Sequence, residues 1–122
     1  MMSSALERIA YQQATRTAVP EIASSLQELF GQKLVALIVG IENPKAVGEW
    51  GRPVRKPHPE TERRLREAYH ITSLLGQVES AAAIRAWFVG MNPDLDDRTP
   101  ALVLQEDPAQ VLRAARSFLT GG

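Results

Sequence analysis

The chain has 122 residues, of which 44% are apolar and 23% charged, and it contains no cysteine. This length suits one domain with its own core or two small modules that share one, and the composition argues against wholesale disorder. The lack of cysteine excludes disulfides, a thiol nucleophile and a cysteine-based zinc site. With no long apolar run and no basic-then-apolar leader pattern, the sequence predicts a cytoplasmic protein.

The formal net charge is zero, but the charges are unevenly distributed. Lys and Arg outnumber Asp and Glu by 8 to 5 in residues 31–76, which gives this region a net charge of +3. Residues 77–122 carry 4 basic and 6 acidic residues, a net charge of −2. A polyanionic partner is therefore expected to meet the middle of the chain.

Proline and glycine divide the chain into helices. Proline suits the first helical position, and a polar residue just before it can accept hydrogen bonds from the first turn. Such pairs occur at Asn43-Pro44, His58-Pro59, Thr99-Pro100 and Asp107-Pro108. Helices are expected to stop, with left-handed caps, at Gly31, Gly40, Gly51, Gly76 and Gly90. These alternating marks predict an all-α chain folded as a helical bundle.

Residues 1–30 are expected to form two amphipathic helices, one over about 4–17 and one that starts after Pro20 and ends at Phe30. This region is a possible dimer interface, although nothing in it demands one. The following segment, residues 33–41, is rich in branched side chains that suit a buried strand equally well. Because no second strand pattern is available to pair with it, a helix is predicted.

Residues 31–76 contain a helix-turn-helix candidate. The first helix carries a small residue, Ala36, the corner carries Gly40, and Val47 and Trp50 would anchor a short second helix. The outer face of the second helix would present Asn43, Lys45, Ala46, Gly48 and Glu49.

A basic, proline-stiffened segment follows this second helix. If the arrangement binds DNA in the major groove, the basic segment would neutralise phosphates. The expected DNA-binding residues are Asn43, Lys45, Glu49, Arg52, Arg55 and Lys56. The alternative is a helical hairpin within a bundle, followed by a solvated basic loop. Gly48 argues against a regular recognition helix, since glycine costs about 1 kcal/mol relative to alanine there.

Apolar stripes predict three further helices. A helix over about 59–75 carries Leu65, Ala68, Tyr69, Thr72 and Leu75, and its solvent face would alternate Arg63, Arg64 and Arg66 with Glu60, Glu62 and Glu67. A second stripe contains Ile84, Trp87, Phe88 and Met91, and a third contains Val111, Leu112, Ala115, Phe118 and Leu119. A short helix is also expected to start at Thr99-Pro100.

No pattern in the chain supports metal binding or catalysis. The acids Asp94, Asp96 and Asp97 fit the calcium-loop spacing only in part, because both registers lack the required glycine and glutamate. His58 and His70 are too far apart in sequence to share a helical metal site and are expected to be caps or surface residues. Without a phosphate loop or a nucleophile elbow, we predict a protein that is not an enzyme and needs no metal or cofactor.

A motif of moderate specificity lies near the C-terminus. It reads W-(x4)-N-P-x-L-x-x-R-x-P-(x3)-L and consists of Trp87, Asn92, Pro93, Leu95, Arg98, Pro100 and Leu104. Together with the helix-turn-helix candidate, it resembles the Xre/MbcA/ParS antitoxins, the partners of RES-domain toxins, over about residues 30–119. Two features depart from that family: Asp96 and Asp97 stand where two glycines are common, and the turn between Gly40 and Val47 is one residue longer.

The resemblance implies an Xre-like helix-turn-helix followed by a helical toxin-binding domain, residues 77–122. Its function would be that of a type II antitoxin that occludes the active site of an NAD-consuming RES toxin and binds operator DNA, as a homodimer or a toxin–antitoxin hetero-oligomer. The expected toxin-binding residues are Asn92, Leu95, Arg98, Pro100, Leu102, Leu104, Arg113 and Arg116. Trp87 and Phe88 would support the domain from its core, and Asn92-Pro93 would form a turn. The alternatives are a stand-alone helix-turn-helix regulator and a helical adaptor that binds protein without a toxin partner.

Overall fold

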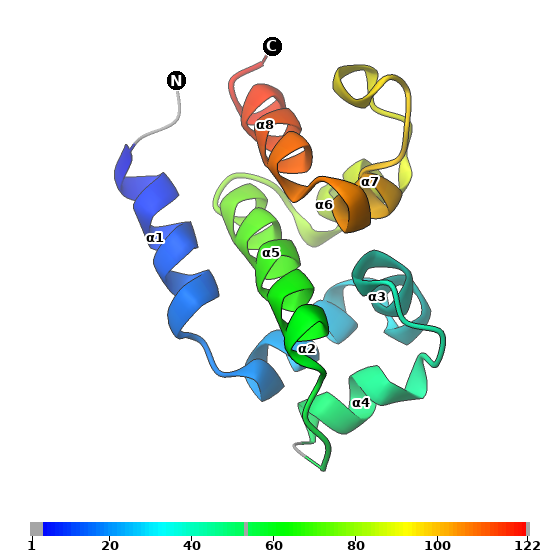
Figure 1. Ribbon diagram of the computed structural model, residues 1–122. Coiled ribbons are helices and arrows are strands. Elements are labelled where there is room, and N and C mark those ends of the chain that lie inside the picture. Colours follow the sequence, from blue (N-terminus) through cyan, green and yellow to red (C-terminus); the bar gives the residue numbers. More distant parts are fainter. Residues whose placement is uncertain (1–3, 53, 122) are drawn as a thin grey trace.

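The computed structural model describes residues 4–52 and 54–121, and these ranges contain eight α-helices, one short 3-10 helix and no strand (Figure 1). The elements are α1 (Ser4–Arg16), α2 (Val19–Phe30), α3 (Gln32–Val39), α4 (Lys45–Gly51), α5 (Pro59–Gly76), α6 (Ala81–Val89), η1 (Pro93–Leu95), α7 (Pro100–Glu106) and α8 (Pro108–Leu119). The predicted all-α class is confirmed. No single described helix is long and apolar enough to cross a membrane; α2 and α3 meet that test only together, and they are bent by 117°.

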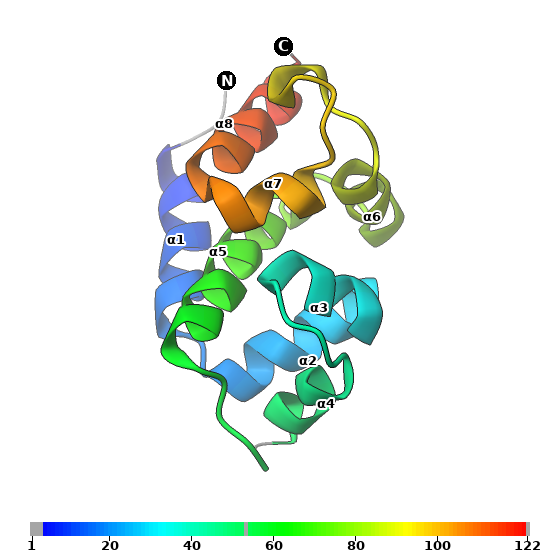
Figure 2. The same cartoon turned by 45° about the vertical axis from the view of Figure 1, so that its right-hand side comes forward.

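The longest helix, α5, lies at the centre of the molecule. It packs against α1, α2, α3, α6, α7 and α8, so helices from both halves of the sequence share it (Figure 1, Figure 2). Its buried residues are Thr61, Leu65, Ala68, Ile71, Thr72, Leu74 and Leu75. Helix α4 packs instead on α2 and α3, at the end of the molecule where α5 begins. The fold is therefore organised around one helix.

The apolar segment 33–41 is helical, as predicted. It forms α3, whose buried residues are Val35, Ala36, Ile38 and Val39. One cluster of buried apolar side chains extends from Ile22 in α2 to Ala115 in α8. All three regions distinguished in the sequence contribute to this cluster, so each depends on the others for its packing.

The helix ends follow the predicted marks in part. Gly31 and Gly40 have positive φ angles of 84° and 77°, and at Gly40 two successive amides bond back to the last turn of α3, which closes the helix. Only Gly40, with ψ 36°, is a left-handed cap; Gly31 has ψ 160°, outside the left-handed helical region, and the prediction is wrong for it and for the other three glycines. Gly51 and Gly76 are the last residues of their helices, and Gly90 is extended, with φ −81°.

Side-chain caps are present at three of the four polar-proline pairs. The amides of Lys45, Glu60 and Gln110 donate to the side chains of Asn43, His58 and Asp107, at 3.1, 3.3 and 3.3 Å. Thr99 makes no such bond, so its predicted role as a side-chain cap is wrong. Each cap satisfies an amide that has no acceptor within its helix.

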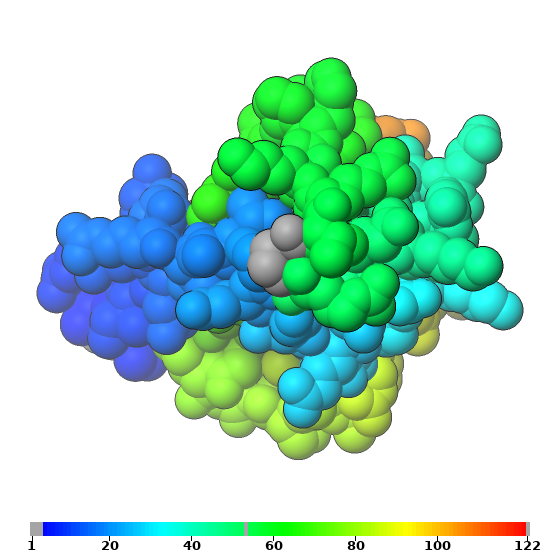
Figure 3. Space-filling model, turned by 90° about the horizontal axis from the view of Figure 1, so that it is seen from below, coloured from blue at the N-terminus to red at the C-terminus, as the bar shows by residue number. Residues whose placement is uncertain are grey.

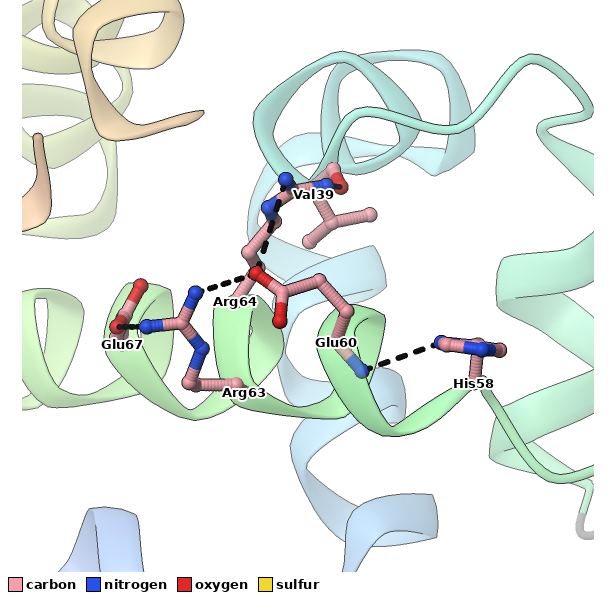
Figure 4. Close-up of polar contacts among 6 residues, drawn as sticks. All are labelled: Val39, His58, Glu60, Arg63, Arg64 and Glu67. Atoms are coloured by element: carbon pink, nitrogen blue, oxygen red, sulfur yellow. Dashed lines mark hydrogen bonds and ion pairs between the residues drawn. The ribbon is translucent and has the colours of Figure 1, made fainter. Parts of the chain in front are cut away.

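Two arginines of α5 bond to the ends of neighbouring helices. Arg64 donates to the carbonyl of Val39 at the end of α3, at 3.2 Å (Figure 4). Arg66 donates two hydrogen bonds, of 3.0 and 2.8 Å, to carbonyls at the end of α1. The prediction that these arginines simply face solvent is therefore wrong, because both are half-buried. It holds for Arg63, which is exposed.

A left-handed turn follows η1. Asp96 and Asp97 have φ angles of 56° and 62°, and they are the only non-glycine residues with positive φ in the described part of the chain. This confirms the expectation that two aspartates make the turn that glycine would favour. The left-handed conformation costs a residue with a Cβ about 1–2 kcal/mol, although aspartate tolerates it better than most.

We predict that Asp97→Gly stabilises the protein by about 0.5–1 kcal/mol, because the relief of backbone strain exceeds the entropy that glycine loses on folding. Thermal unfolding should show a midpoint raised by about 2–5 °C. The matched control is Asp94→Gly, since Asp94 belongs to η1 and has no positive φ. This control should lower the midpoint; equal shifts in both variants would contradict the prediction.

Helix α1 attaches to the bundle largely through polar and ring contacts. Its buried residues are Ala10 and Ala14. Glu7 forms an ion pair of 2.7 Å with Arg116 of α8, and the ring of Tyr11 meets the ring of His70 edge to face, at 5.7 Å between centroids. Burial, and secondly the charge of Arg116, lower the pKa of His70, while the charge of Glu7 opposes this shift. The folded protein therefore holds His70 neutral more firmly than the unfolded chain does.

We expect His70 to make stability depend on pH. Its pKa is lower in the folded state than the value of about 6.5 in an unfolded chain, so its contribution is complete above about pH 6.5 and is lost as pH falls towards the folded-state pKa. Urea unfolding between about pH 5 and 8 should show a free-energy difference between wild type and His70→Gln that shrinks with acidification. Effects of Glu67, whose pKa is raised by burial, occur in both proteins and cancel. A pH-independent difference would contradict this prediction.

Candidate functional site

The motif near the C-terminus forms a loop closed by Asn92. The side chain of Asn92 accepts a hydrogen bond from the Asp94 amide at 2.9 Å, and its carbonyl accepts from the amides of Leu95 and Asp97, both at 2.9 Å. The Asn92 amide donates to the carbonyl of Arg98 at 3.1 Å, which makes an isolated β-bridge. One asparagine therefore fixes both ends of the loop. The prediction that Asn92-Pro93 forms a turn is confirmed, but this turn does not end the preceding helix, because α6 already ends at Val89.

A groove runs between this loop and α8. It has a volume of about 520 Å³ and is lined by Trp87, Met91, Asn92, Pro93, Asp94, Ala114, Ser117, Phe118 and Gly121. A second hollow of about 310 Å³, lined by Asp94, Gln110, Arg113, Ala114 and Ser117, continues along α8. We call these two together the C-terminal groove. Its apolar part is open, because Met91 is 79% exposed and Phe118 45% exposed.

The structure separates the predicted toxin-binding residues into core and surface. Leu95, Pro100 and Leu104 are buried, so they pack inside the domain and offer no contact to a partner. Arg116 is half-buried and turned towards Glu7 of α1, away from the groove. For the three buried residues, the prediction of direct contact is corrected, because they hold the loop and the helices in place. The side chain of Arg116 is still 43% exposed, so its role in toxin binding stays a prediction.

The remaining four predicted residues are accessible. Asn92 and Arg113 line the C-terminal groove. Arg98 is exposed and forms an ion pair of 2.8 Å with Glu106, and Leu102 on the same helix as Glu106 is 45% exposed. The structure thus brings Asn92 and Arg113 to one groove, while Arg98 and Leu102 belong to the neighbouring α7 side.

Sequence reasoning missed Met91 and Phe118. Both were placed on apolar helical stripes, yet α6 ends at Val89, so Met91 lies beyond the helix and outside its apolar face. Phe118 belongs to α8, and its ring packs against the ring of Trp87, with 6.3 Å between ring centroids. Phe88 is fully buried, which confirms its predicted supporting role. Gly90, directly after Val89, is the feature of the sequence that indicates that the helix ends before Met91.

The second candidate surface lies around α4 and the segment that follows it. Val47 and Trp50 are buried, at 0% and 3% exposed, which confirms them as anchors. Ala46 and Gly48 are also buried, so the prediction that they face outwards is wrong. A Cβ at Gly48 would lie 2.7 Å from the side-chain nitrogen of Gln32, so the side chain of α3 fills the space above this glycine.

The predicted DNA-binding residues occupy this end of the molecule, which Figure 3 views from below. Exposed members of the set are Asn43, Lys45, Arg52, Arg55 and Lys56, whereas Glu49 is half-buried. Glu49 accepts a hydrogen bond from Arg55 at 3.2 Å, which makes an ion pair across the end of α4. Helix α4 itself therefore presents only Lys45 and part of Glu49 as charged groups.

A pocket of about 290 Å³ opens between α4 and the start of α5. It is lined by Ile41, Asn43, Ala46, Trp50, Arg55, Lys56, Pro57, His58 and Thr61, and we call it the α4–α5 pocket. The ring of His58 is held by the hydrogen bond from the Glu60 amide, as Figure 4 shows. A hydrogen bond from Arg63, the largest cause, lowers the pKa of Glu60. The acids at the start of α5 are thus engaged by arginines.

Within residues 4–52 and 54–121, no group of three acidic or histidine side chains could hold a metal ion. Comparison with protein-family models, with curated proteins and with solved structures found no match for this chain. The candidate sites therefore rest on the geometry of the chain itself.

The division of the predicted toxin-binding residues into core and surface can be tested with two leucines of α7. Leu104→Ala should destabilise the protein by about 2–5 kcal/mol, because it leaves a cavity at a fully buried site. Leu102→Ala, at a site 45% exposed, should change stability by less than about 1 kcal/mol. Urea denaturation of both variants measures this, and similar losses would show that the two positions are not distinguished as described.

Proposed function

We propose that this protein is a type II antitoxin that binds a RES-type, NAD-consuming toxin and occludes its active site with the C-terminal groove. The observation that supports this best is the loop closed by Asn92, in which the motif residues support an open apolar groove. In the Xre/MbcA/ParS antitoxins, which the sequence resembles, this motif belongs to the toxin-binding domain. Its buried residues keep the loop in shape, and its neighbours supply the contact surface.

The chemistry of the C-terminal groove suits a protein partner. Methionine and aromatic side chains are enriched where proteins bind one another, and Met91, Phe118 and the half-buried Trp87 supply them here. Arg113 and Asp94 lie where the groove becomes polar, so they would form its rim. A partner segment that inserts an apolar side chain against Phe118 would bury surface that now faces water.

We further propose that the end of the molecule around α4 binds operator DNA for autoregulation. The support is the cluster of exposed cations at Lys45, Arg52, Arg55 and Lys56. Because α4 buries most of its seven residues, few side chains remain to read bases, and contact would fall mainly on phosphates. Two alternatives remain. A stand-alone regulator would bind DNA but no toxin, and a protein-binding adaptor would bind neither DNA nor a toxin.

Co-expression tests the antitoxin role. The wild-type chain should rescue growth of cells that express the toxin encoded by the adjoining gene. Phe118→Asp should abolish rescue, because a charge in the groove opposes an apolar contact and hot-spot losses reach about 2 kcal/mol or more. Val78→Asp is the matched control, since Val78 is 59% exposed and does not line the groove. Failure of folded wild-type protein to rescue growth would sink the proposal.

Growth rescue and promoter binding, measured on the same variants, separate the roles of the two surfaces. Arg55→Ala combined with Lys56→Ala should weaken binding to the protein's own promoter and leave growth rescue intact. Wild-type affinity for that promoter should fall steeply with salt, as expected when several phosphates are neutralised. If the double variant lost rescue as well, the division of labour between the surfaces would be wrong. Circular dichroism confirms that each variant is folded.

A further inference from the structure

Several side chains that can donate hydrogen bonds line the α4–α5 pocket. Its donors come from three sources: the amide of Asn43 before α4, the cations of Arg55 and Lys56, and the ring and hydroxyl of His58 and Thr61 at the start of α5. Because Nδ1 of His58 accepts the Glu60 amide, the neutral ring carries its proton on Nε2 and can donate from there. The pocket thus gathers hydrogen-bond donors and positive charge.

The acids near this pocket are occupied by arginines. Glu60 pairs with Arg63, and Glu62 pairs with Arg66 at 3.0 Å. Among the described residues, no acid forms an ion pair with Lys56. The amino group of Lys56 is therefore available to an anion from solution.

Within residues 4–52 and 54–121, Glu49 is the one acid that forms an ion pair with a cation of the pocket. Its carboxylate binds Arg55 at 3.2 Å, and the Arg55 side chain is 61% exposed, so the pair is open to water. An exposed ion pair of this kind is worth little, about 0–1 kcal/mol. An incoming anion can therefore displace Glu49 from Arg55 at small cost.

The position of the pocket adds a further attraction for negative charge. It lies at the N-terminus of α5, an 18-residue helix, whose dipole places partial positive charge there. Beside it lies a more apolar pocket of about 400 Å³ that shares Trp50, Arg55, Lys56 and Pro57 and adds Val19, Pro20, Pro59 and Glu62. The bound anion can therefore carry an apolar or planar substituent.

We propose that the α4–α5 pocket is a binding site for a phosphate group, held by Arg55 and Lys56 with help from His58, and that Glu49 occupies Arg55 when the site is empty. The phosphate group can come from a DNA backbone or from a free phosphorylated small molecule. The site does not depend on toxin neutralisation, so a negative growth-rescue result leaves this proposal standing.

Amide NMR titration of the full chain tests the site. Inorganic phosphate, compared with chloride at equal ionic strength, should cause saturable shifts of the His58 and Thr61 signals. Random-sequence duplex DNA forms the second arm. Saturable shifts with phosphate alone would identify a free phosphorylated ligand, and shifts that only the duplex produces would identify DNA as the source. No saturable shift with either probe would overturn the proposal.

Three variants make the test specific. Lys56→Gln should weaken binding of whichever probe shifts these signals. Glu49→Gln should strengthen it, by up to about fivefold, because Arg55 is released from its ion pair. Lys33→Gln is the matched control, since Lys33 is exposed on α3 and does not line the pocket. If Glu49→Gln left the affinity unchanged or lowered it, or if Lys56→Gln and Lys33→Gln had equal effects, the site would not be the one described.

Discussion

The fold depends on the two arginines by which α5 holds the ends of α3 and α1. A helix leaves its last carbonyls without partners, and leaving such a group buried and unpaired costs about 1–3 kcal/mol. Arg64 and Arg66 are two positions apart, so their side chains leave α5 in nearly opposite directions. One bonds to the end of α3 and the other to the end of α1. A single helix therefore fixes the positions of two neighbours at once.

This constraint also places the two candidate surfaces. Helix α3, once held by Arg64, supports α4 on one side and α7 on the other, where Gln105 donates to the carbonyl of Leu37. The segment Arg55–His58 and α4 then lie at the N-terminal end of α5, and the loop closed by Asn92 lies towards the opposite end of the molecule (Figure 1, Figure 2). The shared core lies between the two surfaces. A cationic surface and an apolar groove are therefore kept apart, although the chain as a whole has no net charge.

Helices and their starts were predictable because their causes are local. Proline positions, capping side chains and apolar spacing depend on residues within one turn of each other, and they located the eight described α-helices, although neither the start of α6 nor η1 was predicted. What covers each helix depends on residues far away in sequence. The burial of Gly48 requires Gln32 of α3, and the burial of Arg64 and Arg66 requires the ends of α3 and α1. Periodicity identifies an apolar face but not the neighbour that covers a polar one, and this is why those residues were assigned to solvent.

The same distinction changes what the motif near the C-terminus means. Its leucines and Pro100 are buried, and the hydrogen bonds of Asn92 are made within the loop itself. The motif therefore determines the shape of the loop more than a direct contact with a partner. A partner would then be selected by residues outside the motif, such as Met91 and Phe118, which the loop shape exposes. Asp96 and Asp97 fit this view: they keep a left-handed turn that the loop requires, at some cost in strain, while their side chains remain exposed. Their two carboxylates also add negative charge to the surface of the loop, so the turn that strains the backbone sets the local charge as well.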